Sequence, residues 1–378
     1  MAAETAARRF PLVSRVKPPG RPIGERIAAL GRTLRESDRP DRETRLARAS
    51  EALNVAALIA SDCGMPELAR DLCWEHHDIF DAARPLPYPV AKLALQPVLN
   101  IVRQMIRDGD GTGAHDMLTA LLRAARAKTT AHVAGRRVDL ADVTLRPEDH
   151  KATCTGLWAA LLSDGTRALA QAGRWTDAAQ AIAAHHGIGT RLLDGRQVSI
   201  LSQLELGKPE QAIATLEESQ LSEPWERTIA AVLRAHCHAA AGVVTRRDLE
   251  AATTAALGLV EDPETATVVF RVRVGLTTLE LDEASHQPQA KDPHGRLRDV
   301  IAAQAATDAY AAREALASPA FRRTVREADE QRLTAVVEQS GLGTGHIPPP
   351  HTAAFDAAIQ SARDELTQLI QPRAPMRA

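Results

Sequence analysis

The stretch LAQAGRWTDAAQAIAA, residues 169–184, places one glycine between two alanine-rich runs that each have helical spacing. Gly173 is followed five residues later by Ala178 and nine residues later by Ile182. Glycine readily adopts the left-handed conformation that ends a helix, and a small residue early in the next helix lets two backbones approach closely. The stretch therefore predicts a helical hairpin.

The same pattern recurs along the chain. Gly207 lies 34 residues after Gly173 and has Ala212 and Leu216 at the same two offsets. Three further copies, the last with two extra residues before its second helix, begin at Gly64, Gly109 and Gly242. Because each hairpin buries only one face, neighbouring hairpins must stack on one another. The sequence therefore predicts an array of hairpins.

A helix–turn–helix period of 34 residues resembles the tetratricopeptide repeat family. The residues that match its turn glycine, turn aromatic, small helix residue and closing proline are Gly173, Gly207, Trp175, Ala178, Ala212 and Pro224. The resemblance implies an all-α, right-handed α-solenoid of about five or six irregular hairpins. Segments such as ALNVAALIASDCG also resemble uncharacterised actinobacterial proteins, some of them found near regulators or peptide natural-product genes.

Changes in composition divide the chain. Residues 1–45 are rich in proline and mixed charge and predict a loose N-terminal arm, and residues 46–342 hold the repeats. After the breaker GLGTGHIPPPH, residues 352–371 predict a C-terminal capping helix. Gly109 and Gly173 are more than one period apart, so residues 128–150 are predicted to be an insertion.

The overall composition excludes several classes of protein. The net charge is -2, which gives no bias toward nucleic acid or anionic membrane, and no apolar run approaches the roughly 20 residues that span a bilayer. The N-terminus lacks the apolar core of an export signal, and four cysteines in 378 residues do not form a disulfide framework. We expect a cytoplasmic protein without a direct nucleic-acid or membrane partner.

The resemblance also implies a binding groove. In the tetratricopeptide family the first helices line a concave groove, and side chains six, ten and thirteen residues before the turn glycine read the ligand. These offsets, and the position two residues before the glycine, fall on Asn54, Gln96, Arg103, Arg107, Arg167, Gln171, Asp194, Gln197 and His236. Recurring guanidinium groups suit the carboxylates of an acidic or C-terminal peptide segment. Alternatively, these arginines only solvate an exposed face or pair with neighbouring acidic residues.

Cysteine and histidine residues offer another interpretation. Cys63, Cys73 and His76 can approach one another across a hairpin, and Cys237 with His238 can add ligands from another repeat. None of them has C-x-x-C or H-E-x-x-H spacing, so the sequence predicts neither a metal site nor a cofactor. Phosphate-binding, dinucleotide-binding and nucleophile-elbow motifs are absent as well.

These observations favour a non-catalytic protein that binds an acidic peptide segment in its concave groove. It would act as an adaptor, a regulator or an accessory subunit in a complex with a biosynthetic or regulatory protein. Two alternatives remain open: an accessory subunit for modification of ribosomal peptides such as lanthipeptides, and a helical metal-dependent enzyme that uses the Cys/His set. Transcriptional regulation is a third class, but only 45 residues precede the repeats, so contact with DNA would need a partner.

Overall fold

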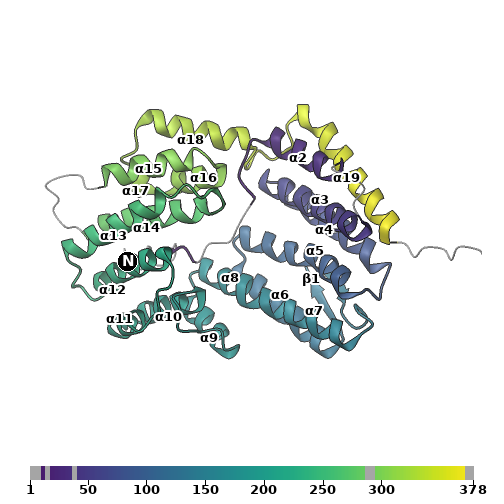
Figure 1. Ribbon diagram of the computed structural model, residues 1–378, viewed down its shortest axis with the longest axis horizontal. Coiled ribbons are helices and arrows are strands. Elements are labelled where there is room, and N and C mark those ends of the chain that lie inside the picture. Colours follow the sequence, from purple (N-terminus) through teal and green to yellow (C-terminus); the bar gives the residue numbers. More distant parts are fainter. Residues whose placement is uncertain (1–9, 13–17, 36–40, 286–293, 371–378) are drawn as a thin grey trace, which may run out of the picture. The chain divides into compact units, whose positions relative to one another are not determined.

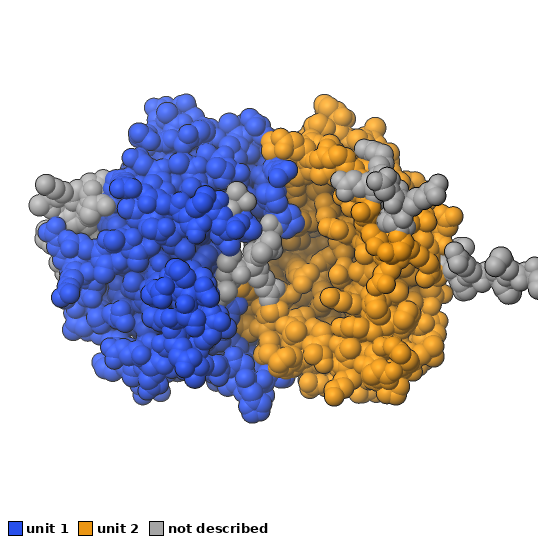
Figure 2. Space-filling view, in the orientation of Figure 1, with its two compact units in different colours: residues 1–21, 169–340 blue, residues 22–168, 341–378 orange. Residues whose placement is uncertain are grey.

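The computed structural model describes residues 10–12, 18–35, 41–285 and 294–370. Almost all of the regular structure in these ranges is helical (Figure 1), which confirms the prediction of an all-α protein. The chain forms two compact units (Figure 2). Unit 1 comprises residues 1–21 and 169–340, and unit 2 comprises residues 22–168 and 341–378.

Unit 2 is built from helices and one β-hairpin. Its first helices are α2 (Ile23–Arg35), α3 (Arg42–Asp62), α4 (Pro66–Asp81), α5 (Tyr88–Arg107) and α6 (Gly111–Ala127). These are followed by β1 (Thr130–Val133), β2 (Arg136–Asp139), α7 (Pro147–Ala160), a π-helical turn (Leu161–Gly165), the start of α8 (Thr166–Gln171) and, from the end of the chain, α19 (Pro349–Ile370).

Unit 1 contains the remaining helices. They are α9 (Trp175–Ala184), α10 (Asp194–Glu205), α11 (Pro209–Glu217), α12 (Pro224–Ala240), α13 (Arg246–Val260), α14 (Val268–Ser285), α15 (Gly295–Ala305), α16 (Ala309–Ala317), α17 (Pro319–Arg322) and α18 (Glu327–Ser340). A short 3₁₀ turn (Thr265–Thr267) precedes α14. Consecutive helices pack side by side, as α12, α13 and α14 do.

The turn glycines adopt the conformation that the sequence predicts. The φ angles of Gly64, Gly109, Gly173, Gly207 and Gly242 are 78°, 89°, 73°, 68° and 70°. Each ends a helix with the paired backbone hydrogen bonds of a Schellman motif; at Gly173, for example, its own N–H donates to the carbonyl of Ala170 and the N–H of Arg174 to that of Leu169.

The small residues that follow these turns lie at helix contacts. The alanines five residues after the first four glycines are fully buried; they are Ala69, Ala114, Ala178 and Ala212. The hairpin prediction is therefore confirmed at these turns. The handedness of the array and its assignment to the tetratricopeptide type stay predictions.

The N-terminal region differs from the expected loose arm. Residues 23–35 form α2, and α3 begins at Arg42, inside the range assigned to the arm. Ile23, Ile27 and Leu30 are buried on one face of α2, which packs on α3 and α19. This apolar stripe is only two turns long and lies between proline and charged residues. The overall composition of residues 1–45 therefore did not indicate a helix.

Helix α19 is part of the core of unit 2. It packs along α3 and also contacts α2 and α4. Its side chains Phe355, Ala362 and Leu366 are buried at this contact. The predicted C-terminal helix thus begins three residues earlier than expected and covers the first helices of unit 2.

The predicted insertion contains the β-hairpin. Strands β1 and β2 pair antiparallel, and their turn is Ala134 and Gly135, both with positive φ. Val133 and Val138 are buried on the inner face. Arg136 pairs with Val133 and lies on the same face, and its guanidinium is 4.5 Å from the ring centroid of Trp74. Because these contacts tie the hairpin to α4, the insertion is an integral part of unit 2.

Candidate functional site

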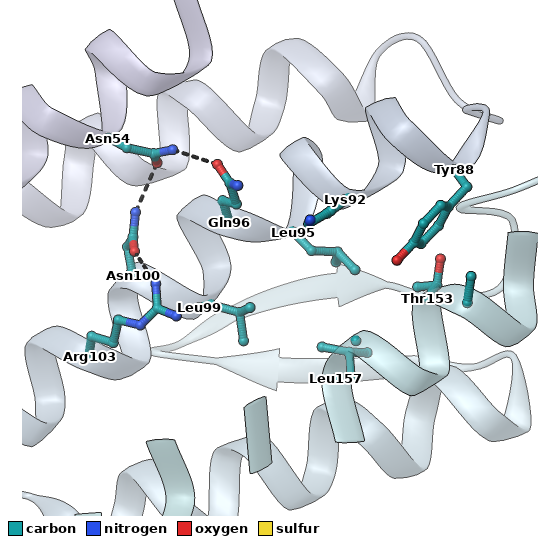
Figure 3. Close-up of a pocket in the computed structure, with 12 residues that line it drawn as sticks. Asn54, Tyr88, Lys92, Leu95, Gln96, Leu99, Asn100, Arg103, Thr153 and Leu157 are labelled. Carbon is teal, nitrogen blue, oxygen red and sulfur yellow. Dashed lines mark hydrogen bonds between the residues drawn. The ribbon is translucent and has the colours of Figure 1, made fainter. Parts of the chain in front are cut away.

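Unit 2 contains a hollow of about 410 Å³ between α3, α5 and α7 (Figure 3). It is lined by Asn54, Tyr88, Lys92, Leu95, Gln96, Leu99, Asn100, Arg103, Ala152, Thr153, Gly156 and Leu157. This volume lies within the range of ordinary ligand sites.

Helix α5 provides most of the lining because of its helical period. Its lining residues follow one another at intervals of three or four, or as neighbouring pairs, from Tyr88 to Arg103. Such spacing places side chains on one face of a helix. Ala91, Val98 and Val102 lie on the other face and are buried in the core. Helix α5 therefore has one packing face and one face that is open to the hollow.

A directed row of hydrogen bonds lies at one end of the hollow (Figure 3). Arg103 Nη1 donates to Asn100 Oδ1 at 2.9 Å, and Asn100 Nδ2 donates to Asn54 Oδ1 at 2.8 Å. Asn54 Nδ2 in turn donates to Gln96 Oε1 at 2.8 Å. Every amide oxygen of this amide row, Asn54, Gln96 and Asn100, accepts from a neighbour. The row ends on Gln96 Nε2, which has no acceptor among the described residues.

A buried carboxylate holds the other end of the row. Arg103 Nε and Nη2 donate to Asp164 Oδ2 at 3.1 Å and 3.0 Å. Asp164 is buried and belongs to the π-helical turn Leu161–Gly165, a type of helix irregularity that is frequent at functional sites. Arg103 therefore pairs with an acidic residue, as in the alternative interpretation of the groove arginines.

The rest of the hollow combines an apolar wall with polar side chains. Leu95, Leu99 and Leu157 supply the apolar surface (Figure 3). Lys92 is exposed, and its ammonium group forms no ion pair within the described ranges. Tyr88 lies at the far end from Arg103. The hollow therefore offers cationic and amide donors beside aliphatic surface.

The structure brings together three of the nine predicted groove residues: Asn54, Gln96 and Arg103. Sequence reasoning missed Asn100, which lies one residue from a predicted offset. Its spacing provides a signal, because it lies four residues after Gln96 and three before Arg103 and therefore shares their face of α5.

The other six predicted residues do not line this hollow. Arg107 and Gln171 are exposed at the ends of their helices. Arg167 and Asp194 are half-buried, and Gln197 and His236 are buried. The Gln197 side chain is fully buried, and its Nε2 donates to the carbonyl of Leu192 at 2.9 Å. Peptide binding by these residues stays a prediction.

The Cys/His residues occupy separate packing positions. His76 Nε2 lies 3.0 Å from Ser50 Oγ, and Gln104 Nε2 donates to Cys73 Sγ at 3.5 Å. Burial raises the pKa of Cys73 and that of Cys237 to about 12, so both thiols are neutral near pH 7. Within the described ranges, no three His, Cys, Asp or Glu side chains are grouped so that they can hold a metal ion.

Two buried histidines predict loss of stability in mild acid. Burial lowers the pKa of His76 to about 3 and that of His236 to about 4, from the ordinary 6.5. The unfolded chain then binds more protons than the folded protein below about pH 6.5. Each histidine should therefore lower the free energy of unfolding by about 1.4 kcal/mol per pH unit as the pH falls from 6.5 toward its folded pKa.

Urea denaturation at pH 7 and pH 5 measures this slope. His236→Leu should remove its share of the pH dependence, because leucine does not titrate. The control His132→Leu, at an exposed strand position, should keep the slope of the parent protein. Equal slopes for His236→Leu and the parent would contradict the assignment.

Comparison of the chain with family models, with curated proteins and with solved structures gave no match. Among the described helices, none is both long and apolar enough to cross a bilayer.

Proposed function

We propose that this chain is a cytoplasmic, non-catalytic protein that binds an acidic peptide segment of a partner in the hollow of unit 2. It would serve as an adaptor, a regulator or an accessory subunit. The observation that carries the proposal is the amide row, whose oxygens each accept one hydrogen bond and whose last group, Gln96 Nε2, is an open donor.

The direction of the hydrogen bonds sets the chemistry of the ligand. A carboxylate only accepts hydrogen bonds, so it complements Gln96 Nε2 and the ammonium group of Lys92. A ligand group that only donates would have to share amide oxygens that each already accept one hydrogen bond. The leucine wall adds a place for an aliphatic residue next to the carboxylate. We therefore infer a ligand in which an aliphatic side chain neighbours an acidic side chain or a chain terminus.

The lining favours binding over catalysis. Of the described residues that line the hollow, none is a His, a Cys, an Asp or a Glu. These are the residue types that most often transfer protons or attack substrates in enzymes. The amide row and Arg103 form a chain of hydrogen bonds that ends on an open donor, which suits recognition of an acceptor.

Gly156 allows the site to be blocked without disturbing the fold. It lies within α7 and lines the hollow, and a Cβ built on it meets no atom within 4 Å. Gly156→Phe should therefore fill the hollow and weaken the best ligand from an array of acidic hexapeptides by at least about 30-fold, as measured by fluorescence anisotropy. A second measurement at higher salt should show weaker binding to the parent, because screening reduces the attraction of charges.

Gly258→Phe is the matched control. Gly258 is an exposed glycine within α13, and its Cβ would also meet nothing within 4 Å. This variant should bind the hexapeptide as the parent does. If Gly156→Phe bound the peptide with unchanged affinity while keeping the parent's circular dichroism, the hollow would not be the binding site.

A further inference from the structure

Three consecutive residues of the N-terminal region are buried in unit 1 although they form no helix or strand. Phe10 is 3% exposed and Leu12 is 8% exposed, and Pro11 between them is buried as well. Phe10 and Leu12 belong to the hydrophobic core of unit 1. A short segment without helix or strand structure thus packs into the core of unit 1.

The helix residue that receives this segment is one of the predicted groove positions. His236 lies on α12, six residues before the turn glycine Gly242. The rings of Phe10 and His236 meet edge to face, with centroids 5.7 Å apart and an interplanar angle of 78°. The position assigned to partner recognition in unit 1 is therefore in contact with the protein's own chain.

His236 also has unused hydrogen-bonding capacity. Its side chain is buried, and Nε2 has no hydrogen-bond partner among the described residues. A buried polar atom without a partner is unusual in a packed core. The Phe10 ring packs against the His236 ring but cannot accept or donate a conventional hydrogen bond, so a ligand with an acceptor or donor at this place would compete well.

A second anchor holds the same segment farther along the chain. The Gly20 N–H donates to Asp308 Oδ2 at 2.7 Å, and the Ala309 N–H donates to the Gly20 carbonyl at 2.9 Å. A Cβ at residue 20 would lie 2.8 Å from Ala309 N, so only glycine fits. This anchor at the start of α16 tethers residues 10–12 close to their site even when they leave it.

We propose that the face of α12 around His236 is a second peptide-binding site, specific for an aromatic–proline–aliphatic sequence, and that Phe10–Leu12 is its tethered ligand. Proline stiffens the extended conformation of such a peptide and lowers the entropy cost of binding. A partner carrying this sequence occupies the site after displacing the tethered segment. The inference concerns unit 1 and does not depend on the hollow of unit 2.

Removal of the two side chains tests the proposal in the full-length protein. The probe is a fluorescein-labelled peptide with the sequence of residues 7–16, ARRFPLVSRV. The double variant Phe10→Ala, Leu12→Ala should bind it about 100-fold more tightly than the parent, the factor expected when a ligand of about 10 μM affinity is tethered at roughly millimolar effective concentration. The control Pro18→Ala, Pro19→Ala changes two exposed residues of the same segment and should bind like the parent.

A cleavable chain covers the case in which the double variant does not fold. Residues 13–17 are replaced by a protease site, and the protein is cut after folding. The labelled peptide should then exchange with the cut N-terminal fragment, and a peptide with Ala in place of Phe and Leu should not. If the peptide bound neither the folded double variant nor the cut protein, the proposal would be overturned. Equal binding of the peptide to the cut and the uncut protein would also overturn it.

Discussion

Replacing Gln96 by glutamate is expected to weaken binding of an acidic hexapeptide at least about 100-fold while the free energy of unfolding stays within about 0.5 kcal/mol of the parent value. The substitution keeps the shape of the side chain and the acceptor oxygen that Asn54 Nδ2 uses. It replaces the open N–H₂ group at the end of the amide row by a carboxylate oxygen. A favourable donor is thus replaced by a negative charge that repels the carboxylate of the peptide. A 100-fold loss of affinity corresponds to about 2.7 kcal/mol of binding free energy.

Gln211→Glu provides the comparison for this variant. Gln211 is exposed on α11, so the change adds the same charge to unit 1 and alters no residue that lines the hollow. Its affinity for the peptide should lie within twofold of the parent's. If Gln96→Glu and Gln211→Glu weakened binding equally, the effect would come from net charge and the amide row would have no part in recognition. Thermal denaturation of both variants checks that the fold is retained.

Phe355→Ala is expected to lower the free energy of unfolding by about 3–5 kcal/mol, the range for truncating a buried aromatic side chain. Phe355 is 1% exposed and lies on α19, which packs along α3. Amide hydrogen exchange should show the loss of protection in α3 and α19. Thr367→Ala, an exposed change on the same helix, should alter stability by less than about 0.5 kcal/mol. A loss below 1 kcal/mol for Phe355→Ala would mean that α19 contributes little to the core of unit 2.

The turns were predictable because their signal is local. A glycine that ends a helix and an alanine five residues later interact within one hairpin, so the pattern around Gly173 or Gly207 needs no knowledge of the rest of the fold. The same locality explains why the C-terminal helix was predicted within a few residues. By contrast, the burial of Phe10 depends on helices more than 200 residues away in the sequence, and no periodicity marks an isolated apolar residue in a region rich in proline and arginine.

The candidate site was predictable in part for a related reason. Gln96 and Arg103 share one face of α5, so a rule based on helical offsets places them together. Gln197 satisfies the same rule, but its amide is used to hold the Leu192 carbonyl inside unit 1. Whether a polar side chain at a groove offset meets solvent or its own backbone depends on the loops around it, and the offsets do not contain that information.

The order in which the two units appear along the chain has a consequence for biosynthesis. The sequence of unit 1 is interrupted by residues 22–168 of unit 2. The core of unit 2 includes α19, which follows α3 by roughly 300 residues. At the usual rate of about 5–20 residues per second, a ribosome makes α3 some 15–60 s before it makes α19. Throughout that interval the part of α3 that packs against α19 lacks its partner helix. The nascent chain therefore exposes a hydrophobic surface that a ribosome-associated chaperone is suited to bind.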